Sequence, residues 1–357
     1  MANGMCKRAV FLGANKCPQY IVDSSVIPEI GPGQVLARIR LATICGSDIH
    51  TLQGKRKEAT PSILGHEGVA EIVLNERCNP SNLLAGDRVT FSVIDSCGEC
   101  ERCAEGMNQK CHSIFKYGHS SLHVRSGLSG TYSSHIILHK GTRIVKLPDH
   151  VTDKMAAPIN CALATMVNAV GSFEHKRPSK RSVLIQGAGL LGMYGCALLH
   201  DAGFGKIYCS DLNLNRLKLV SLFGGIAIPT GKERDVLQDN EIDIVIEVCG
   251  VSAAFDIGMK LLKPGGSYIL VGLVHPDSHL NVTAESIIRK CLTIKGIHNY
   301  ADNHLDEAVA FMSRTANKYP FEQLVGPAFS LNQFDSALQE AVQGRFCRVA
   351  LNPSLVE

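Results

Sequence analysis

The feature that most restricts the fold is a glycine pattern between a strand-like and a helix-like segment. Gly187, Gly189 and Gly192 form G-x-G-x-x-G within the run VLIQGAGLLGMYG. The first glycine permits a tight turn, the second lets the backbone approach a pyrophosphate, and the third lets helix pack close to strand. The start of the helix, at Leu190 and Leu191, supplies unpaired N–H donors and a positive dipole. The pattern therefore predicts a dinucleotide-binding unit.

The acidic residue that such a unit needs is also present. Asp211 follows Gly192 by nineteen residues, at the end of the strand-like run KIYCSDL. A carboxylate there can bind both hydroxyls of an adenosine ribose and would repel a 2′-phosphate, which favours NAD over NADP. Two interpretations of Arg216 are open. Its side chain contacts the ribose or accommodates some NADP, or it is a solvated charge on a helix surface. The alternative for the glycines is a turn without a ligand, and their context favours the nucleotide.

The two halves of the chain differ in pattern. Past Lys180, apolar runs at 182–189, 206–212, 243–250 and 267–273 alternate with amphipathic stretches, which predicts a doubly wound parallel sheet. The first 150 residues carry short β-type runs at 35–44, 69–74, 87–94 and 133–138, which predict a mostly β unit. The last sixty residues predict helices over 304–318 and 332–344, the second capped by Asn332, and a tail that packs onto the first unit.

Composition limits the classes of function. With 45% hydrophobic and 19% charged residues, the 357-residue chain is expected to fold into two domains. A formal charge of +3, from 36 Lys+Arg and 33 Asp+Glu, is too weak to favour nucleic-acid binding. No apolar run reaches the roughly 18–20 residues that span a bilayer, and the opening MANGMCKRAV lacks a signal-peptide core. We expect a cytoplasmic protein without nucleic-acid or membrane partners.

Four of the fourteen cysteines lie close together and predict a metal site over about residues 95–112. In a reducing compartment such a cluster indicates metal rather than disulfides, and four thiolates match a closed, structural zinc site. An iron–sulfur cluster and a nucleic-acid-binding zinc ribbon are the alternatives, and the acidic loop disfavours the ribbon. The four residues are Cys97, Cys100, Cys103 and Cys111.

A second set of metal-ligand types lies in C-G-S-D-I-H at 45–50 and G-H-E at 65–67. Cys45, His66 and Glu67 offer a thiolate, an imidazole and a carboxylate, and Cys161 is the best candidate for a further ligand. A Cys/His/Cys set leaves a fourth position open for water or substrate, as catalytic zinc requires. The ordinary alternative is packing, because a single buried Cys or His more often packs than binds metal.

Together these motifs resemble the zinc-dependent medium-chain alcohol dehydrogenases of the medium-chain dehydrogenase/reductase superfamily, along essentially the whole chain. The resemblance implies an α/β protein with a GroES-like, mostly β catalytic domain over 1–162 and 298–357. It also implies a doubly wound Rossmann domain over 163–297, an active site in the cleft between the domains, and a homodimer or homotetramer.

The resemblance also assigns roles to individual residues. Cys45, His66 and Cys161 resemble the ligands of the catalytic zinc, and Glu67 resembles a carboxylate beside the metal that binds it in some members. Asp48 resembles the carboxylate that orients the zinc-bound imidazole, and Ser47 resembles the hydroxyl that receives the substrate proton. His50 resembles the imidazole that passes this proton to water, and Thr165 resembles a residue that lines the nicotinamide pocket.

The chemistry can also be argued from the residues. Zinc in a dry cleft binds an alcohol oxygen and stabilises the alkoxide, so that hydride can pass to NAD, and the reverse reaction reduces an aldehyde or ketone. Ser47 would relay the hydroxyl proton to His50, whose ordinary pKa is near 6.5.

We expect two zinc ions per chain. The alternatives are a non-catalytic or redox-sensing dinucleotide-binding protein and a zinc-free quinone reductase, and the open zinc position favours the alcohol dehydrogenase.

Two features bear on the substrate, an alcohol or carbonyl compound. Lys55, Arg56 and Lys57 either attract an anionic substrate or belong to a solvated loop. The run G-I-H-N-Y at 296–300 resembles a bacterial subgroup associated with phosphonate catabolism, which implies an acidic substrate near His298 or Tyr300.

Overall fold

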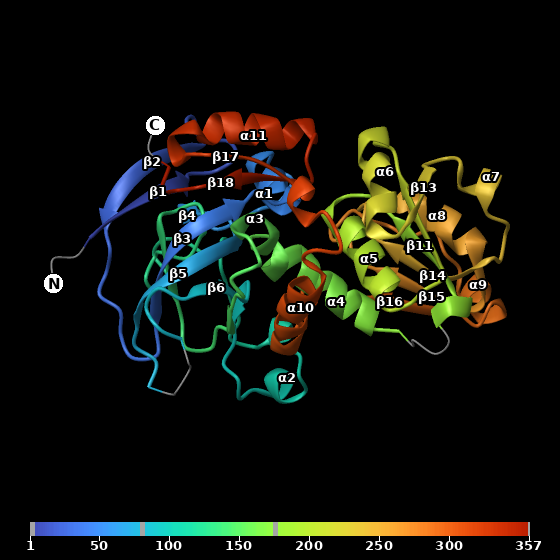
Figure 1. Ribbon diagram of the computed structural model, residues 1–357, viewed down its shortest axis with the longest axis horizontal. Coiled ribbons are helices and arrows are strands. Elements are labelled where there is room, and N and C mark those ends of the chain that lie inside the picture. The colour runs from blue at the N-terminus through green and yellow to red at the C-terminus, as the bar shows by residue number, and fades with distance from the viewer. Residues whose placement is uncertain (1–3, 79–82, 174–177, 356–357) are drawn as a thin grey trace. The chain divides into compact units, whose positions relative to one another are not determined.

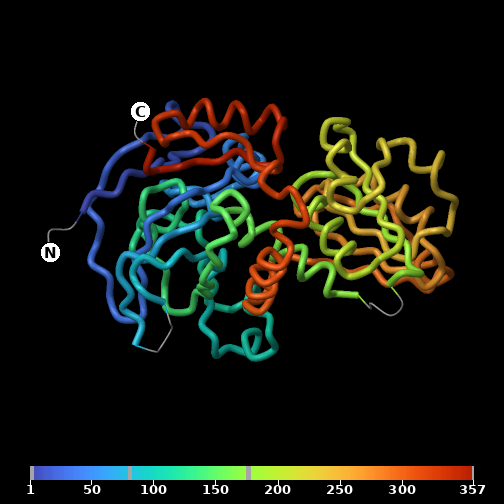
Figure 2. The backbone as a smooth tube through the Cα atoms, in the orientation of Figure 1, coloured from blue at the N-terminus to red at the C-terminus, as the bar shows by residue number. Residues whose placement is uncertain are grey.

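The computed structural model describes residues 4–78, 83–173 and 178–355, and the chain forms two compact units. The second unit comprises Ala162–Tyr300 and Lys318–Pro320. The first comprises Met1–Cys161, Ala301–Asn317 and Phe321–Glu357, so the chain returns to it after the second, as the red segment of Figure 2 shows. The sequence placed these boundaries after residues 162 and 297.

The main sheet of the first unit brings distant segments together. Its order is β10-β6-β5-β3-β18-β17, and β9 also pairs with β3. The antiparallel register sets Thr43 opposite both Glu67 of β5 and Ala350 of β18, so both partner strands meet the end of β3. The strands are β3 (Val35–Thr43), β5 (Glu67–Asn75), β6 (Arg88–Phe91), β9 (His135–Leu138), β10 (Ile144–Lys146), β17 (Val325–Phe329) and β18 (Arg348–Leu351).

Smaller elements complete the first unit (Figure 1). A three-stranded sheet has the order β2-β1-β4, and β7 pairs with β8. Helix α11 packs against β17 and β18. The bounds are β1 (Met5–Phe11), β2 (Tyr20–Val26), β4 (Ser62–Ile63), β7 (Ile94–Asp95), β8 (Phe115–Lys116), α1 (Gly46–Leu52), α2 (Glu101–Ala104), α3 (Asp153–Ala156), α10 (Asp302–Thr315) and α11 (Phe334–Gln343).

The second unit is a six-stranded parallel sheet flanked by helices (Figure 1). Its order, β13-β12-β11-β14-β15-β16, is that of a doubly wound fold, which confirms the predicted Rossmann domain. The strands are β11 (Ser182–Gln186), β12 (Lys206–Asp211), β13 (Ile226–Pro229), β14 (Ile242–Glu247), β15 (Leu262–Leu270) and β16 (Thr293–Gly296). The helices are α4 (Ala164–Gly171), α5 (Leu190–Asp201), α6 (Leu214–Val220), α7 (Glu233–Val236), α8 (Ser252–Leu261) and α9 (Ala284–Arg289).

Two details of the C-terminal segment differ from the prediction. Helix α10 begins and ends earlier than the predicted 304–318. Asn332 does not cap α11, because it lies inside a short 3₁₀ turn, Leu331–Gln333, that leads into the helix. Ser330 caps that turn instead, and its backbone N–H donates to the Gln333 side chain in a capping box. Among the described residues, no helix is both long enough and apolar enough to cross a membrane.

Candidate active site and metal centres

Four predicted ligand side chains meet in the first unit. The ligand atoms of Cys45, His66, Glu67 and Cys161 all lie within 4.8 Å of one another. Glu67 is the first residue of β5, and His66 immediately precedes it. Cys45 immediately precedes α1, and Cys161 lies in a π-helical turn, Ile159–Leu163. Such turns are frequent at functional sites. Two sulfur atoms and one imidazole at this spacing suit tetrahedral zinc.

Asp48 positions the imidazole of His66. Its Oδ1 lies 3.6 Å from Nδ1 of His66, and the imidazole also hydrogen bonds with the Cys45 side chain. Oδ2 of Asp48 accepts hydrogen bonds from the Cys45 backbone N–H at 3.0 Å and from the Tyr132 hydroxyl at 2.8 Å. Burial lowers the pKa of His66, but Asp48 and Cys45 together outweigh burial, and the pKa is raised. This carboxylate–histidine pair is typical of metal-binding imidazoles.

Arg348, which the sequence analysis did not identify, binds Glu67. Its Nε donates to Glu67 Oε2 and its Nη2 to Oε1, both at 2.8 Å, and Nη2 also lies 3.4 Å from the Cys45 sulfur. Thr43 donates a further hydrogen bond to Glu67 Oε2 at 2.6 Å. Glu67 is fully buried, and burial raises its pKa even though Arg348 opposes this. Both carboxylate oxygens of Glu67 therefore already accept hydrogen bonds from the protein.

The two predicted relay residues lie on one face of α1. Ser47 Oγ is enclosed and has no hydrogen-bond partner among the residues that the structure describes. His50, three positions further along the helix, is exposed. An enclosed hydroxyl two residues from Cys45, followed on the same face by an exposed imidazole, can carry a proton outward.

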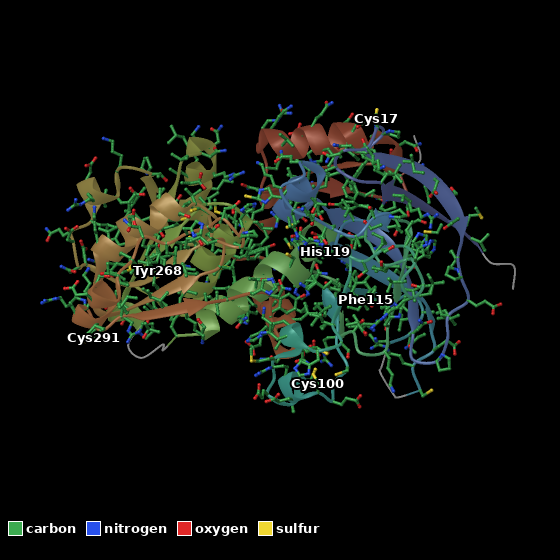
Figure 3. The ribbon with its side chains drawn as sticks, turned by 180° about the vertical axis from the view of Figure 1, so that it is seen from behind. Cys17, Cys100, Phe115, His119, Tyr268 and Cys291 are labelled. Atoms are coloured by element: carbon green, nitrogen blue, oxygen red, sulfur yellow. The ribbon has the colours of Figure 1, made fainter. Side chains whose placement is uncertain are left out.

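The four-cysteine lobe is also assembled. The sulfur atoms of Cys97, Cys100, Cys103 and Cys111 all lie within 4.8 Å of one another, and Figure 3 marks Cys100 at the edge of the first unit. The backbone N–H of Cys97 donates to the Cys111 sulfur at 3.3 Å, and that of Cys100 to the Cys97 sulfur at 3.4 Å. A hydrogen bond from the His112 backbone lowers the pKa of Cys100 to about 6. Such donors stabilise thiolates, the form that binds metal.

The glycine loop between β11 and α5 has the shape that a dinucleotide needs. Gly187 has φ = +115°, which favours glycine. A Cβ on Gly192 would lie 1.9 Å from the Gly187 carbonyl oxygen, so only glycine fits there. A Cβ on Gly189, the N-cap of α5, would meet nothing within 4 Å, which leaves room for a ligand at the helix N-terminus. Leu190 and Leu191 form the first turn of α5.

Asp211 connects this loop to the next one. Its carboxylate accepts hydrogen bonds from the backbone N–H groups of Ala188 at 2.6 Å and Asn213 at 2.7 Å. Arg216, on α6, has an enclosed Nε without a partner among the described residues. Thr165 is buried on α4, four residues after Cys161.

The predicted substrate-attracting residues have different surroundings. Lys55 and Lys57 are exposed, whereas Arg56 forms an ion pair with Glu58 at 2.6 Å. In the second unit, His298 is exposed and Tyr300 is buried. Glu58 was not identified from the sequence, and neither was its second partner, His119.

Comparisons with known proteins match both units. The model of the alcohol dehydrogenase GroES-like domain matches residues 31–149, and that of the zinc-binding dehydrogenases matches residues 191–314. L-threonine 3-dehydrogenase of Pseudoalteromonas translucida is 26% identical over 336 residues, which are 91% of this chain and 94% of that protein.

Solved structures share the fold over nearly the whole chain. An alcohol dehydrogenase from Thermotoga maritima has a TM-score of 0.91 and 26% identity, over 98% of this chain and all of that one. A zinc-binding dehydrogenase from Sinorhizobium meliloti, bound to NADP, has a TM-score of 0.85 and 20% identity, with the same coverage. The fold predicted from the sequence, a GroES-like unit and a Rossmann unit, is therefore confirmed.

Proposed function

Because this chain belongs to the zinc-dependent medium-chain dehydrogenase family and is an oxidoreductase of that family, we propose that it is an NAD-dependent alcohol dehydrogenase. It transfers a hydride between NAD(H) and a primary or secondary alcohol, or the corresponding aldehyde or ketone. The convergence of Cys45, His66 and Cys161 within 4.8 Å supports this proposal most directly. These three ligands leave one position of a tetrahedral metal open.

The residues around this cluster support the chemistry. Zinc, when bound, acts as a Lewis acid that lowers the pKa of an alcohol beside it. Asp48 keeps the His66 ring in its ligating orientation, and Arg348 balances the charges of Glu67 and Cys45. Ser47 accepts the hydroxyl proton, and His50 passes it to water. Two zinc ions are proposed per chain, the second held by the four-cysteine lobe in a structural role.

In the second unit, the glycine loop holds the pyrophosphate of NAD. The nicotinamide ring of the bound NAD would accept the hydride. The open space at Gly189 and the unpaired N–H groups at the start of α5 support this role of the loop. Asp211 binds the ribose hydroxyls, and we assign Arg216 to the adenosine side of the same site and Thr165 to the nicotinamide pocket.

The test is a panel of substrates read as NADH formation, together with metal analysis of the purified protein. The panel contains simple alcohols, polyols, L-threonine and phosphonate-bearing alcohols, the last because Lys55 and Lys57 are exposed beside α1. We expect about two zinc ions per chain and oxidation of at least one alcohol. One zinc ion per chain and no oxidation would favour the non-catalytic or redox-sensing dinucleotide binder. We also propose that the protein is cytoplasmic and forms a homodimer or homotetramer. The domain limits 1–162, 163–297 and 298–357 remain predictions.

Replacing Asp211 with alanine should weaken the preference for NAD. The change removes the charge that repels a 2′-phosphate and the acceptor for the ribose hydroxyls, so the ratio of kcat/KM with NAD to that with NADP should fall about a hundredfold. Steady-state kinetics with both cofactors measure this ratio. Arg216→Gln in the same background should reverse part of the gain with NADP. A wild-type protein that used both cofactors equally would contradict the assignment of Asp211.

A further inference from the structure

A second imidazole–carboxylate pair lies beside the candidate zinc ligands in the first unit. The His119 ring packs against that of His66, with centroids 5.0 Å apart and the ring planes at 32°. His119 Nδ1 lies 3.0 Å from Glu58 Oε1. Figure 3 shows His119 well removed from the lobe that carries Cys100. Neither residue of this pair takes part in the proposed hydride transfer or proton relay.

Glu58 fixes the orientation of the His119 ring. The Glu58 side chain is only 10% exposed and is held in turn by Arg56, so its carboxylate is a buried, charged acceptor. In a neutral imidazole, the proton is on the nitrogen that faces such an acceptor. Nδ1 of His119 therefore carries the proton, and Nε2 presents a lone pair.

That lone pair is available to a ligand. The side chain of His119 is 12% exposed, and Nε2 has no hydrogen-bond partner among the described residues and is not sealed from solvent. A solvent-accessible acceptor on a largely buried, oriented imidazole can bind water or a donor group of a ligand, so Nε2 is a suitable contact for a substrate at the candidate active site. Because the His119 ring packs against that of the proposed ligand His66, a donor bound by Nε2 would lie beside the proposed metal site.

We propose that His119 is a specificity-determining residue, whose Nε2 accepts a hydrogen bond from a hydroxyl or ammonium group on the carbon next to the reacting one. The substrate class is therefore a vicinal diol or an amino alcohol rather than a simple aliphatic alcohol. This inference rests on the proposed function, since it concerns the substrate of the same site. Ring packing alone would not discriminate between substrates that differ only by one donor group.

The test measures the NAD-dependent oxidation of three compounds by the zinc-loaded protein at pH 8. The compounds are butan-2-ol, butane-2,3-diol and 3-aminobutan-2-ol. The wild type should show a kcat/KM at least about tenfold higher for the diol or the amino alcohol than for butan-2-ol. The favoured compound identifies a neutral or a charged donor. His119→Phe keeps a ring against His66 but removes the acceptor, and it should bring this ratio close to one.

Three further variants make the result specific. His119→Met also removes the acceptor and serves if the phenylalanine variant does not fold. Glu58→Gln keeps an oxygen that can accept from Nδ1–H, so it should retain most of the preference. His123→Phe changes an exposed histidine of the same loop and should leave all three activities unchanged.

The possible failures are distinguishable. If the zinc-loaded wild type oxidises none of the three compounds or the wider panel, the proposed function itself fails. If it oxidises butan-2-ol as efficiently as the other two, or if the preference survives in His119→Phe, the inference is overturned while the proposed function stands.

Discussion

Cys161→Ala is expected to reduce kcat/KM for alcohol oxidation by at least about a thousandfold, because it removes one of three proposed ligands and with it several kcal/mol of Lewis-acid stabilisation. The same protein should retain one zinc ion per chain instead of two, since the four-cysteine lobe is separate. Metal analysis and NADH formation with the best substrate of the panel measure both effects.

Two cysteine variants serve as controls for this result. Cys291→Ser changes an exposed thiol of the second unit (Figure 3) and should keep both zinc ions and full activity. Cys103→Ala should also lose one zinc ion, but from the lobe, so the two losses can be compared. If Cys161→Ala kept two zinc ions or wild-type activity, the ligand set proposed here would be wrong.

The parts of the fold that sequence predicts well are those with local signals. In the second unit, each strand and its helix are contiguous, and apolar runs alternate with amphipathic ones, so the order of elements follows from the chain. The loop from β11 to α5 is fixed by three glycines within six residues. Capping was less predictable, because Ser330, Asn332 and Gln333 all offer polar side chains and the 3₁₀ turn decides between them.

The candidate zinc ligands were predictable for a similar reason. Cys45, His66 and Glu67 belong to short motifs, and their ligand chemistry can be recognised without knowing the fold. Cys161 required more, because nothing local distinguishes it from the scattered cysteines elsewhere in the chain, and only its combination with the other motifs selected it. The structure adds a reason, since the π-helical turn carries Cys161 to the other three residues.

Residues that complete the site through distant pairing were not predictable. Arg348 is 281 positions from Glu67 and meets it because β18 pairs with the same strand, β3, as β5 does. Tyr132 reaches Asp48 over 84 positions, and His119 reaches Glu58 over 61. No spacing or periodicity in the sequence encodes these contacts, which depend on the register of the antiparallel sheet and on the loops at its ends.

Arg348→Met should destabilise the protein by about 3–5 kcal/mol, because it leaves the fully buried Glu67 carboxylate without its counter-charge and without the hydrogen bonds from the guanidinium. The methionine fills much of the same volume, so the effect measures charge more than packing. Urea unfolding followed by far-UV circular dichroism is the measurement, since the chain has no tryptophan for fluorescence.

The pairing of the two charges is tested by restoring neutrality. Glu67→Gln in the Arg348→Met background removes the unpaired carboxylate, so the double variant should recover much of the lost stability. Arg345→Met, three residues earlier, breaks an exposed ion pair with Glu340 and should leave the urea midpoint near that of the wild type. If Arg348→Met unfolded at the wild-type midpoint, or if the double variant were no more stable than Arg348→Met, the guanidinium would not compensate Glu67. The carboxylate would then have to be neutral in the folded protein, consistent with the raised pKa that burial gives it.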